Sequence, residues 1–394
     1  MIPDLTQVDR RQVRRFLKAI ADGVPTDGLT SWVTVGEQRI RDALAKHLAR
    51  VRAGEFLVRF MLGNPGSGKS HLLRLLASDA VDTNFATSHC THDLQSRAAF
   101  NRPDQIYVRI LNSLSIPGNV SDPLNEVLSR WGELALKSLP PFRRMGNLWQ
   151  LAQLGLLPDA SSIPPRTRVA LLGYMMASER GEDDERELFV NAFRGDRVEN
   201  RVLASELTRL GVAPKFIGYT PNNYDVGFYF RQLATLAHLI KSIGLSGMVV
   251  LVDEAAAITD LRSNSRRKAY KVVDEIIQNT PGFTSFYMVI AYLPALFTQL
   301  VQDCSEFDLP YLDRWQSVLG PELLEVEPLS SSDKYELFGK LAKLHSVAYG
   351  WQASSKSAYL TVELVRESEK TSWSTRDFVR RSLVVLDKLE AAQK

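Results

Sequence analysis

The octapeptide Gly63-Asn64-Pro65-Gly66-Ser67-Gly68-Lys69-Ser70 constrains this chain more than any other stretch, because it has the form G-x-x-x-x-G-K-[ST]. Glycines in such a loop let successive backbone N–H groups point at phosphate oxygens, and the N-terminus of the following helix adds partial positive charge. We expect Lys69 to reach the β- and γ-phosphates of a nucleoside triphosphate and Ser70 to bind Mg²⁺. The motif therefore predicts a phosphate-binding loop.

The flanking residues supply the context that this motif requires. Residues 55–62 form an apolar run suited to a strand, and residues 71–77 carry leucines at helical spacing. A strand, a glycine-rich loop and a helix in this order favour a nucleotide site over an ordinary glycine-rich turn. The residues expected to contact the nucleotide are Gly63, Asn64, Pro65, Gly66, Ser67, Gly68, Lys69, Ser70 and His71.

A second motif is the apolar run 248–252, which ends in Asp253-Glu254. Such a run is typical of a strand buried on both faces of a parallel sheet, and ligand sites lie at the carboxyl ends of such strands. We therefore expect the pair to emerge beside the phosphate-binding loop. It matches a Walker B motif with its adjoining glutamate. Asp253 is predicted to hold Mg²⁺, through water because this ion sheds its waters reluctantly, and Glu254 to polarise the attacking water.

The alternative for this pair is an ordinary surface position, which five preceding apolar residues disfavour. Two arginines are further candidates for contact with the γ-phosphate. Arg314 follows the strand predicted over 285–292 and is a candidate finger donated to a neighbouring subunit. Arg376 opens a late helix and is a candidate sensor that folds back on the nucleotide. A plain salt bridge is the alternative for each arginine.

Composition indicates an ordinary soluble globular protein, with 45% hydrophobic and 24% charged residues. There is no apolar run of 18 residues and no signal-peptide pattern, so we expect a cytoplasmic protein without membrane contact. Cys90 and Cys304 lack the spacing of a zinc site or a disulfide framework. His89, Cys90 and His92 cluster, but the end of a strand is the favoured interpretation over a metal site.

The net charge of +3 is far from that of a dedicated DNA-coating domain. Basic residues nevertheless cluster in three places. Each cluster is either solvated surface or, together with the others, a nucleic acid contact. The clusters are Arg10, Arg11, Arg14 and Arg15; Arg143 and Arg144; and Arg262, Arg266, Arg267 and Lys268.

The predicted fold is α/β, a P-loop NTPase parallel sheet with flanking helices, a helical insertion and a helical C-terminal region. Helices are predicted over 7–21, 37–52, 105–111 and 229–243, with strands over 84–90, 247–254 and 285–292. The predicted segments are N-terminal helices (1–53), the P-loop half of the core (54–116), a helical insertion (117–225), the Walker B half (226–328) and a lid or winged-helix-like tail (329–394). The tail is expected to begin at a cap at Ser332-Asp333.

This order of motifs resembles the AAA+ and STAND group of ATPases, in particular its initiator-type branch. Closer similarity is to the ATP-binding proteins of bacterial BREX phage-defence systems, of the BrxD kind. The resemblance covers the core and tail well and the insertion poorly. It rests on Gly23-Val24-Pro25, Thr34-Val35-Gly36-Glu37, Gly68-Lys69-Ser70-His71-Leu72-Leu73, Asp253-Glu254 and Pro328-Leu329-Ser330.

The resemblance implies an ATPase that uses ATP and Mg²⁺, forms a homo-oligomer and acts on double-stranded DNA with other defence proteins. One departure concerns the strand that ends at Ala291-Tyr292, which lacks the small polar residue often found as the first sensor. Tyr292 either replaces that residue or the role is absent. Two alternatives remain open: a nucleotide-gated scaffold or switch with little turnover, and a transposition- or initiator-like DNA regulator.

Overall fold

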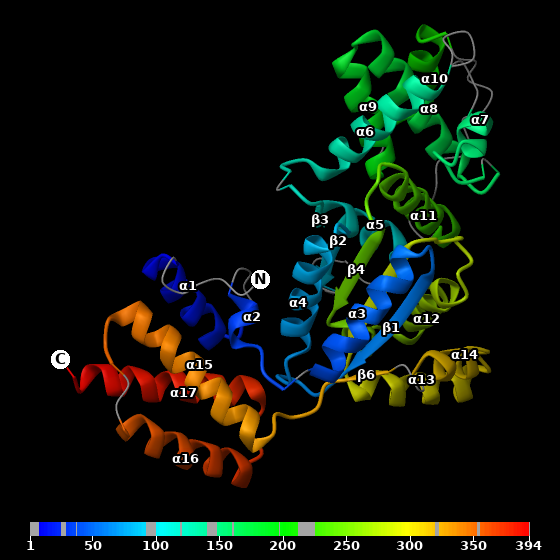
Figure 1. Cartoon of the computed structure of the whole chain (residues 1–394). Helices are drawn as coiled ribbons and strands as arrows, with labels where there is room; N and C mark the ends of the chain where they lie inside the picture. The colour runs from blue at the N-terminus through cyan, green and yellow to red at the C-terminus, as the bar shows by residue number, and fades with distance from the viewer. Residues whose placement is uncertain are drawn as a thin grey trace.

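A six-stranded sheet lies at the centre of the protein (Figure 1). The computed structural model describes residues 8–24, 29–36, 38–91, 100–118, 120–139, 148–159, 161–196, 198–211, 225–319, 323–352 and 355–393. The strand order is β3-β2-β4-β5-β1-β6. The strands are β1 (Phe56–Leu62), β2 (Ala86–Thr91), β3 (Leu114–Ser115), β4 (Met248–Asp253), β5 (Phe286–Tyr292) and β6 (Leu324–Glu325).

The sheet is mixed, which corrects the expectation of a wholly parallel one. All other neighbouring strands are parallel, but β3 pairs antiparallel to β2, with Thr87 opposite Ser115. This strand has only two residues and follows α5 (Pro103–Asn112) after a single residue. A two-residue strand has no readable side-chain period, so neither β3 nor the equally short β6 was predictable. The longer strands β4 and β5 were predictable because both are buried along their whole length and therefore have apolar sequences.

Helices cover both faces of the sheet. On one face α3 (Gln38–Arg52) and α4 (Lys69–Asp82) pack against Val249 and Val289. The opposite face packs Val250 and Ile290 against a larger helical layer. That layer contains α5, α11 (Val226–Ser242), α12 (Ser263–Ile277), α13 (Pro294–Phe307) and α14 (Leu312–Leu319), with a short 3₁₀ helix, η3 (Ala255–Ile258), after β4.

A separate helical bundle joins the two ends of the chain. In it α1 (Arg10–Ala21) and α2 (Thr30–Val33) pack with α15 (Ser331–Tyr349), α16 (Ser355–Lys370) and α17 (Thr375–Ala391) around one core (Figure 1). The two helices predicted at the N-terminus therefore divide: α1 lies with the bundle, whereas α3 lies on the sheet. The short helix α2 was not predicted. Every element described after residue 330 is a helix.

Both long bundle helices α15 and α17 begin with a capping box. Ser330 caps α15, and its hydroxyl and the Asp333 carboxylate exchange hydrogen bonds with the opposite backbone N–H groups. Ser374 and Asp377 repeat this arrangement at α17. The cap predicted at Ser332-Asp333 is therefore wrong by two residues, because Asp333 occupies the third helical position of the box rather than its start.

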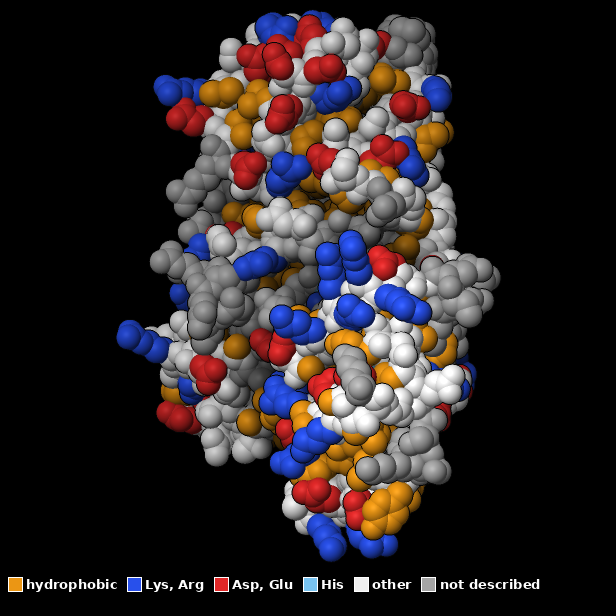
Figure 2. All heavy atoms as spheres, turned by 90° about the vertical axis from the view of Figure 1, so that its left-hand side faces the viewer, with side chains coloured by type: hydrophobic (Ala, Val, Ile, Leu, Met, Phe, Trp, Pro, Cys, Tyr) orange, Lys and Arg blue, Asp and Glu red, His pale blue; other side chains and the backbone are white. Residues whose placement is uncertain are grey.

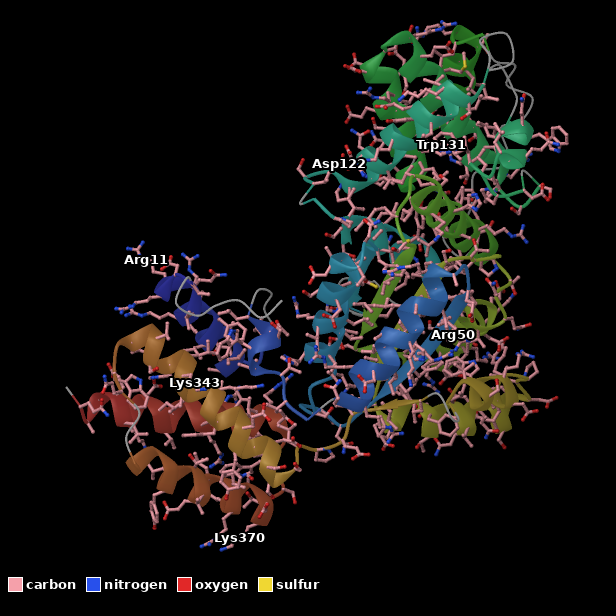
Figure 3. The ribbon with its side chains drawn as sticks, in the orientation of Figure 1. Arg11, Arg50, Asp122, Trp131, Lys343 and Lys370 are labelled. Atoms are coloured by element: carbon pink, nitrogen blue, oxygen red, sulfur yellow. The ribbon has the colours of Figure 1, made fainter. Side chains whose placement is uncertain are left out.

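The described elements α6 to α10 of the predicted insertion are helices, and they form a lobe beyond one end of the sheet (Figure 1). Trp131 is fully buried within it (Figure 3). The helices α8 and α9 form its tightest pair, joined at Gly181, whose φ of 70° ends α8 in the left-handed conformation. The lobe contains α6 (Pro123–Ser138), α7 (Leu148–Gln153), α8 (Pro165–Arg180), α9 (Asp183–Arg194) and α10 (Asn200–Arg209).

The α8–α9 contact leads to a stability prediction. A Cβ atom added at Gly173 of α8 would overlap the ring of Phe189, which is fully buried. Overpacking of this kind destabilises a core by about 1–3 kcal/mol, so Gly173→Ala is expected to lower the midpoint of thermal unfolding. Gly339→Ala is the matched control, because Gly339 lies in α15 with no atom within 4 Å of an added Cβ. Alanine there is expected to stabilise by up to about 1 kcal/mol. Equal effects of the two changes would contradict the close packing at Gly173.

Candidate functional site

A cavity of about 550 Å³ lies between the carboxyl edge of the sheet and the helical bundle. On the sheet side it is lined by Pro65, Gly66, Ser67, Gly68, Lys69, Ser70, His71, Leu72, Asp253, Glu254, Ala257, Thr259, Asp260, Ala291, Tyr292 and Leu293. On the bundle side it is lined by Ile20, Gly23, Val24, Val33, Thr34, Val35, Leu329, Leu337, Leu341, Thr375, Arg376 and Val379. Most of the residues predicted for a nucleotide site therefore share one cavity.

The glycine-rich loop turns directly from β1 into α4. Gly66 and Gly68 have φ angles of 75° and 115°, a region that favours glycine. Gly68 is the N-cap of α4 and provides no side-chain hydrogen bond to the first turn. The N–H groups at the start of α4 thus lack a side-chain cap, and their partial positive charge faces the cavity that Lys69 and Ser70 line. This is the geometry that binds a phosphate group.

Lys69 is the cation at the centre of the loop. Its Nζ donates hydrogen bonds to the carbonyl oxygens of Gly63, at 2.7 Å, and Asn64, at 3.0 Å. Burial lowers the pKa of Lys69, while the negative charge of Asp253 opposes that shift and the nearby Arg376 reinforces it. Lys69, Asp253 and Arg376 are therefore close enough to share one electrostatic environment.

The acidic pair stands at the end of β4. Asp253 is buried, and its Oδ1 accepts a hydrogen bond from the backbone N–H of Glu254 at 2.9 Å. Glu254 is exposed and has a φ of 57°, a left-handed conformation that is uncommon for a residue other than glycine. Backbone strain of this kind clusters at functional sites.

The strand order defines how this pair is placed relative to the phosphate-binding loop. β5 lies between β1 and β4, so Asp253 is one strand removed from the strand that leads into the phosphate-binding loop. Both strands still end at the same edge, and the cavity spans the intervening β5 through Ala291 and Tyr292. The side chain of Ser70 and the carboxylate of Asp253 are oxygen donors of the kind that Mg²⁺ prefers. Among the described residues no group of three or more His, Cys, Asp or Glu could hold a metal ion, so the ion would also need oxygens from a phosphate.

Arg376 brings the bundle to the loop. It lies in the first turn of α17, and its backbone N–H donates a hydrogen bond to the Gly66 carbonyl at 3.1 Å. Its side chain passes Gly23, where an added Cβ would lie 3.0 Å from the arginine Nε. The structure thus places Arg376 against the nucleotide loop, while its role as a sensor stays a prediction.

Arg314 is not among the cavity residues. It lies on α14 and forms a two-point ion pair with Asp274 of α12, with Nε–Oδ1 and Nη2–Oδ2 distances of 2.9 and 2.7 Å. The Asp274 side chain is buried, and this pairing raises the pKa of Arg314. Within one chain Arg314 therefore forms a salt bridge, which was the alternative to a role at the γ-phosphate. Its donation to a neighbouring subunit stays a prediction.

Tyr292 lines the cavity at the position of the expected first sensor. Its ring packs edge-on against Phe60, with the ring centroids 5.6 Å apart. Burial raises the pKa of Tyr292 to about 12, and Glu325 acts in the same direction. The phenol is therefore protonated at neutral pH and able to donate a hydrogen bond.

Sequence reasoning missed the apolar bundle side of the cavity and the acid Asp260. Ile20, Leu337 and Leu341 come from two helices far apart in the chain, and each is an ordinary apolar residue of an amphipathic helix. Only their packing together reveals a shared surface, so no sequence signal was available for them. Thr34 and Val35, in contrast, belong to the stretch that resembles the BREX proteins, and they line the same region.

His71 connects α4 to this stretch. Its Nε2 lies 2.8 Å from Thr34 Oγ1, and that hydroxyl donates its own proton to the Thr30 carbonyl at 2.9 Å. The Thr34 oxygen therefore accepts from His71, which fixes the Nε2–H tautomer. Burial lowers the pKa of His71 to about 4, so the ring is neutral at physiological pH.

This pKa predicts a pH-dependent stability. The unfolded chain takes up the proton near pH 6.5 and the folded chain only near pH 4, so the stabilisation is complete above pH 6.5 and is lost as the pH falls toward 4. The free energy of unfolding that this one group contributes falls by about 2 kcal/mol at pH 5. Urea unfolding at pH 7 and pH 5 should show it in the wild type. His71→Gln keeps a donor but does not titrate, and its stability should fall less between these pH values. An identical fall would contradict the assignment.

The cavity, its glycine-rich loop and the converging charges of Lys69, Asp253 and Arg376 define a nucleotide-binding α/β protein. A family model described as "BREX system ATP-binding protein BrxC/D" matches residues 8–138 and 169–394, and the chain belongs to this family. The match includes most of the predicted insertion, which corrects the expectation that the resemblance covers it poorly. No curated protein and no solved structure shows significant similarity to the chain. None of the helices in the described ranges is long and apolar enough to cross a bilayer.

Proposed function

We propose that this protein binds ATP with Mg²⁺ in the cavity between sheet and bundle, hydrolyses it, and acts on DNA as part of a phage-defence complex. One observation carries the proposal. The loop at Gly66, the pair Asp253-Glu254 and the bundle residue Arg376 come from distant parts of the chain and line one cavity. Each has a charge or a backbone geometry suited to a different part of a triphosphate.

The roles of the residues follow from their positions. The N–H groups of the loop and of the uncapped first turn of α4 bind the phosphate oxygens. Lys69 neutralises their charge, and Ser70 and Asp253 hold the metal. When bound, Mg²⁺ offsets the negative charge that develops during phosphoryl transfer. Glu254, the exposed carboxylate beside Asp253, orients the attacking water and accepts its proton.

Arg376 supplies the coupling between nucleotide and bundle. It is anchored to the loop through its backbone and faces the cavity with its side chain. A γ-phosphate attracts this guanidinium, and its loss on hydrolysis removes that attraction. Because Arg376 lies in the first turn of α17, the position of the bundle responds to the nucleotide state. Movement of this kind is what a DNA-acting complex requires from its ATPase.

A second candidate function is a nucleotide-gated switch with little turnover. Two observations favour it: the strained backbone of Glu254 and the bulky Tyr292 where a small polar sensor is expected. Phage plating on cells that carry Glu254→Gln separates the two functions. A switch keeps its protective effect when hydrolysis stops, whereas a motor loses it.

The DNA-linked function is tested by ATPase rates with and without double-stranded DNA, together with the mass of the protein in ATP. We expect DNA to raise the rate, the mass to exceed that of one chain, and the specific rate to increase with protein concentration. A rate that is independent of concentration and unchanged by Arg314→Ala would contradict a site shared between subunits. Absence of DNA binding at low salt would remove both the DNA-acting motor and the DNA regulator.

A further inference from the structure

We infer that the outer face of α1 is the surface through which this protein binds the backbone of double-stranded DNA. The inference rests on the DNA-linked function proposed above and names the surface that performs it. α1 carries five basic residues and has no acidic residue within the helix, in a chain whose whole net charge is only +3. Positive charge is therefore concentrated on this helix. The five residues are Arg10, Arg11, Arg14, Arg15 and Lys18.

All five basic side chains lie on one side of the helix. At 100° per residue they span an arc of about 140°. The opposite side carries Val13, Phe16 and Leu17, which are buried in the bundle core. Figure 2 shows basic side chains gathered where α1 forms the upper edge of the bundle, and Figure 3 shows Arg11 directed away from it.

Within the described residues, no acidic side chain is paired with the charges on this face. Across the described parts of the chain, Arg10, Arg11, Arg15 and Lys18 form no side-chain hydrogen bond or ion pair, and all are exposed. Asp9 is engaged as the helix cap, where its carboxylate accepts the backbone N–H of Arg11. Like charges four residues apart on a helix destabilise it. Asp9 and Asp22 stand at the two caps of α1, but no acidic residue lies within the row itself, and such a row favours an external polyanion.

The helix is held firmly in place. Arg14 Nε donates to the Ala348 carbonyl at 2.8 Å, and its guanidinium lies 5.2 Å from the centre of the Tyr349 ring. At the other end Arg380 Nε donates to the Ala21 carbonyl at 3.1 Å. The basic face is therefore presented by a rigid element, which reduces the entropy lost on binding.

The chemistry of this face favours duplex DNA over other polyanions. A membrane-binding helix inserts an apolar face, but the apolar face of α1 is already covered by the bundle. Single-stranded nucleic acid is bound through aromatic residues that stack on bases, and the exposed positions of α1 carry none. The planar guanidinium of arginine donates paired hydrogen bonds to phosphate oxygens. Residues 10–18 extend about 12 Å along the helix, which is about the width of the major groove between the two phosphate backbones.

The inner end of the same helix reaches the nucleotide cavity. Ile20, at the end of α1, and Gly23 and Val24, just beyond it, line that cavity, and Gly23 lies against the Arg376 side chain. α1 and the turn that follows it thus connect the basic face with Arg376, the residue proposed to face the γ-phosphate. DNA bound on α1 and ATP bound in the cavity are expected to influence each other's affinity through this helix.

The test compares two triple variants of the full chain by fluorescence anisotropy with a short labelled duplex of random sequence. Arg10→Ala/Arg11→Ala/Arg15→Ala removes three charges from α1 and leaves Arg14 in its packing position. The control, Arg39→Ala/Arg41→Ala/Lys46→Ala, removes three exposed charges from α3. We expect the α1 variant to bind at least about tenfold more weakly, and its slope of log affinity against log salt to be about 2.7 smaller in magnitude. The control should change affinity less than about twofold.

The other outcomes overturn the inference in distinguishable ways. Equal DNA affinity of the two variants would rule out α1 as the DNA-binding surface and would leave the proposed DNA-linked function untouched. If the wild type does not bind DNA at low salt, both the α1 surface and the DNA-linked function are ruled out. Affinity for a fluorescent ATP analogue then shows whether the proposed nucleotide site is still supported. If the α1 variant loses affinity for phosphatidylserine vesicles but not for DNA, the surface binds membranes instead. Unchanged affinity of both variants for the ATP analogue confirms that they are folded.

Discussion

Glu254→Gln is expected to lower ATP turnover by about 10²–10⁴-fold while affinity for ATP is retained, because a positioned general base contributes a factor of that size. Glutamine has nearly the same shape as glutamate but takes up no proton. Glu254 is exposed at the end of β4 and lines the cavity, so the change leaves the buried core intact. Phosphate release measures turnover, and titration with a fluorescent ATP analogue measures affinity.

The control for this change is Glu306→Gln. Glu306 is an exposed acid on α13 outside the cavity, so its substitution makes the same charge change without touching the site. Its turnover should equal that of the wild type. If Glu254→Gln also turns over at the wild-type rate, another group activates the water, and Asp260, which lines the same cavity, becomes the candidate. That result would contradict the role of Glu254 as the general base.

Lys69→Ala is expected to weaken ATP binding by about 100-fold, since a hydrogen bond to a charged group contributes up to about 3 kcal/mol. Lys69 Nζ donates hydrogen bonds to the carbonyl oxygens of Gly63 and Asn64, and its charge interacts with that of Asp253. No other lysine lines the cavity described here. Titration with the fluorescent analogue measures the loss.

Thermal unfolding of Lys69→Ala must be measured beside its affinity, because the lysine also bonds to the loop. Lys137→Ala is the matched control, since Lys137 is an exposed lysine on α6 far along the chain from the cavity residues. Its affinity should be that of the wild type. Wild-type affinity in a folded Lys69→Ala protein would show that ATP binds elsewhere.

The phosphate-binding loop and the acidic pair were predictable because their signals are local. Gly66 and Gly68 are required by the positive φ angles of the loop. β4 was predictable because a strand whose six residues are all buried has an apolar sequence. The order of the strands is different in kind. Nothing in the residues of β5 indicates that it lies between β1 and β4, since all three are largely apolar segments of similar length.

The bundle side of the site was predictable at Arg376 and at stretches that carry the family resemblance, which include Gly23-Val24, Thr34-Val35 and Leu329. The packing of α1 against α15 and α17 depends on apolar faces that would suit many partners. Arg376 and Arg314 likewise look alike in sequence, each near the start of a helix, yet one faces the cavity and the other binds Asp274. The difference arises from a buried carboxylate forty residues before Arg314, a pairing that no local pattern marks.

The central claim is that ATP binds between the phosphate-binding loop and the first turn of α17. Amide hydrogen exchange of the full chain with and without ATP and Mg²⁺ tests it most directly. We expect slower exchange in three separate segments on adding nucleotide: residues 64–72 of the loop and α4, 33–35 at the end of α2, and 375–379 of α17. At an ATP concentration that saturates the wild type but lies well below the Kd of Lys69→Ala, that variant should show none of these changes. Protection confined to the loop, with residues 375–379 exchanging as before, would contradict a site shared by sheet and bundle.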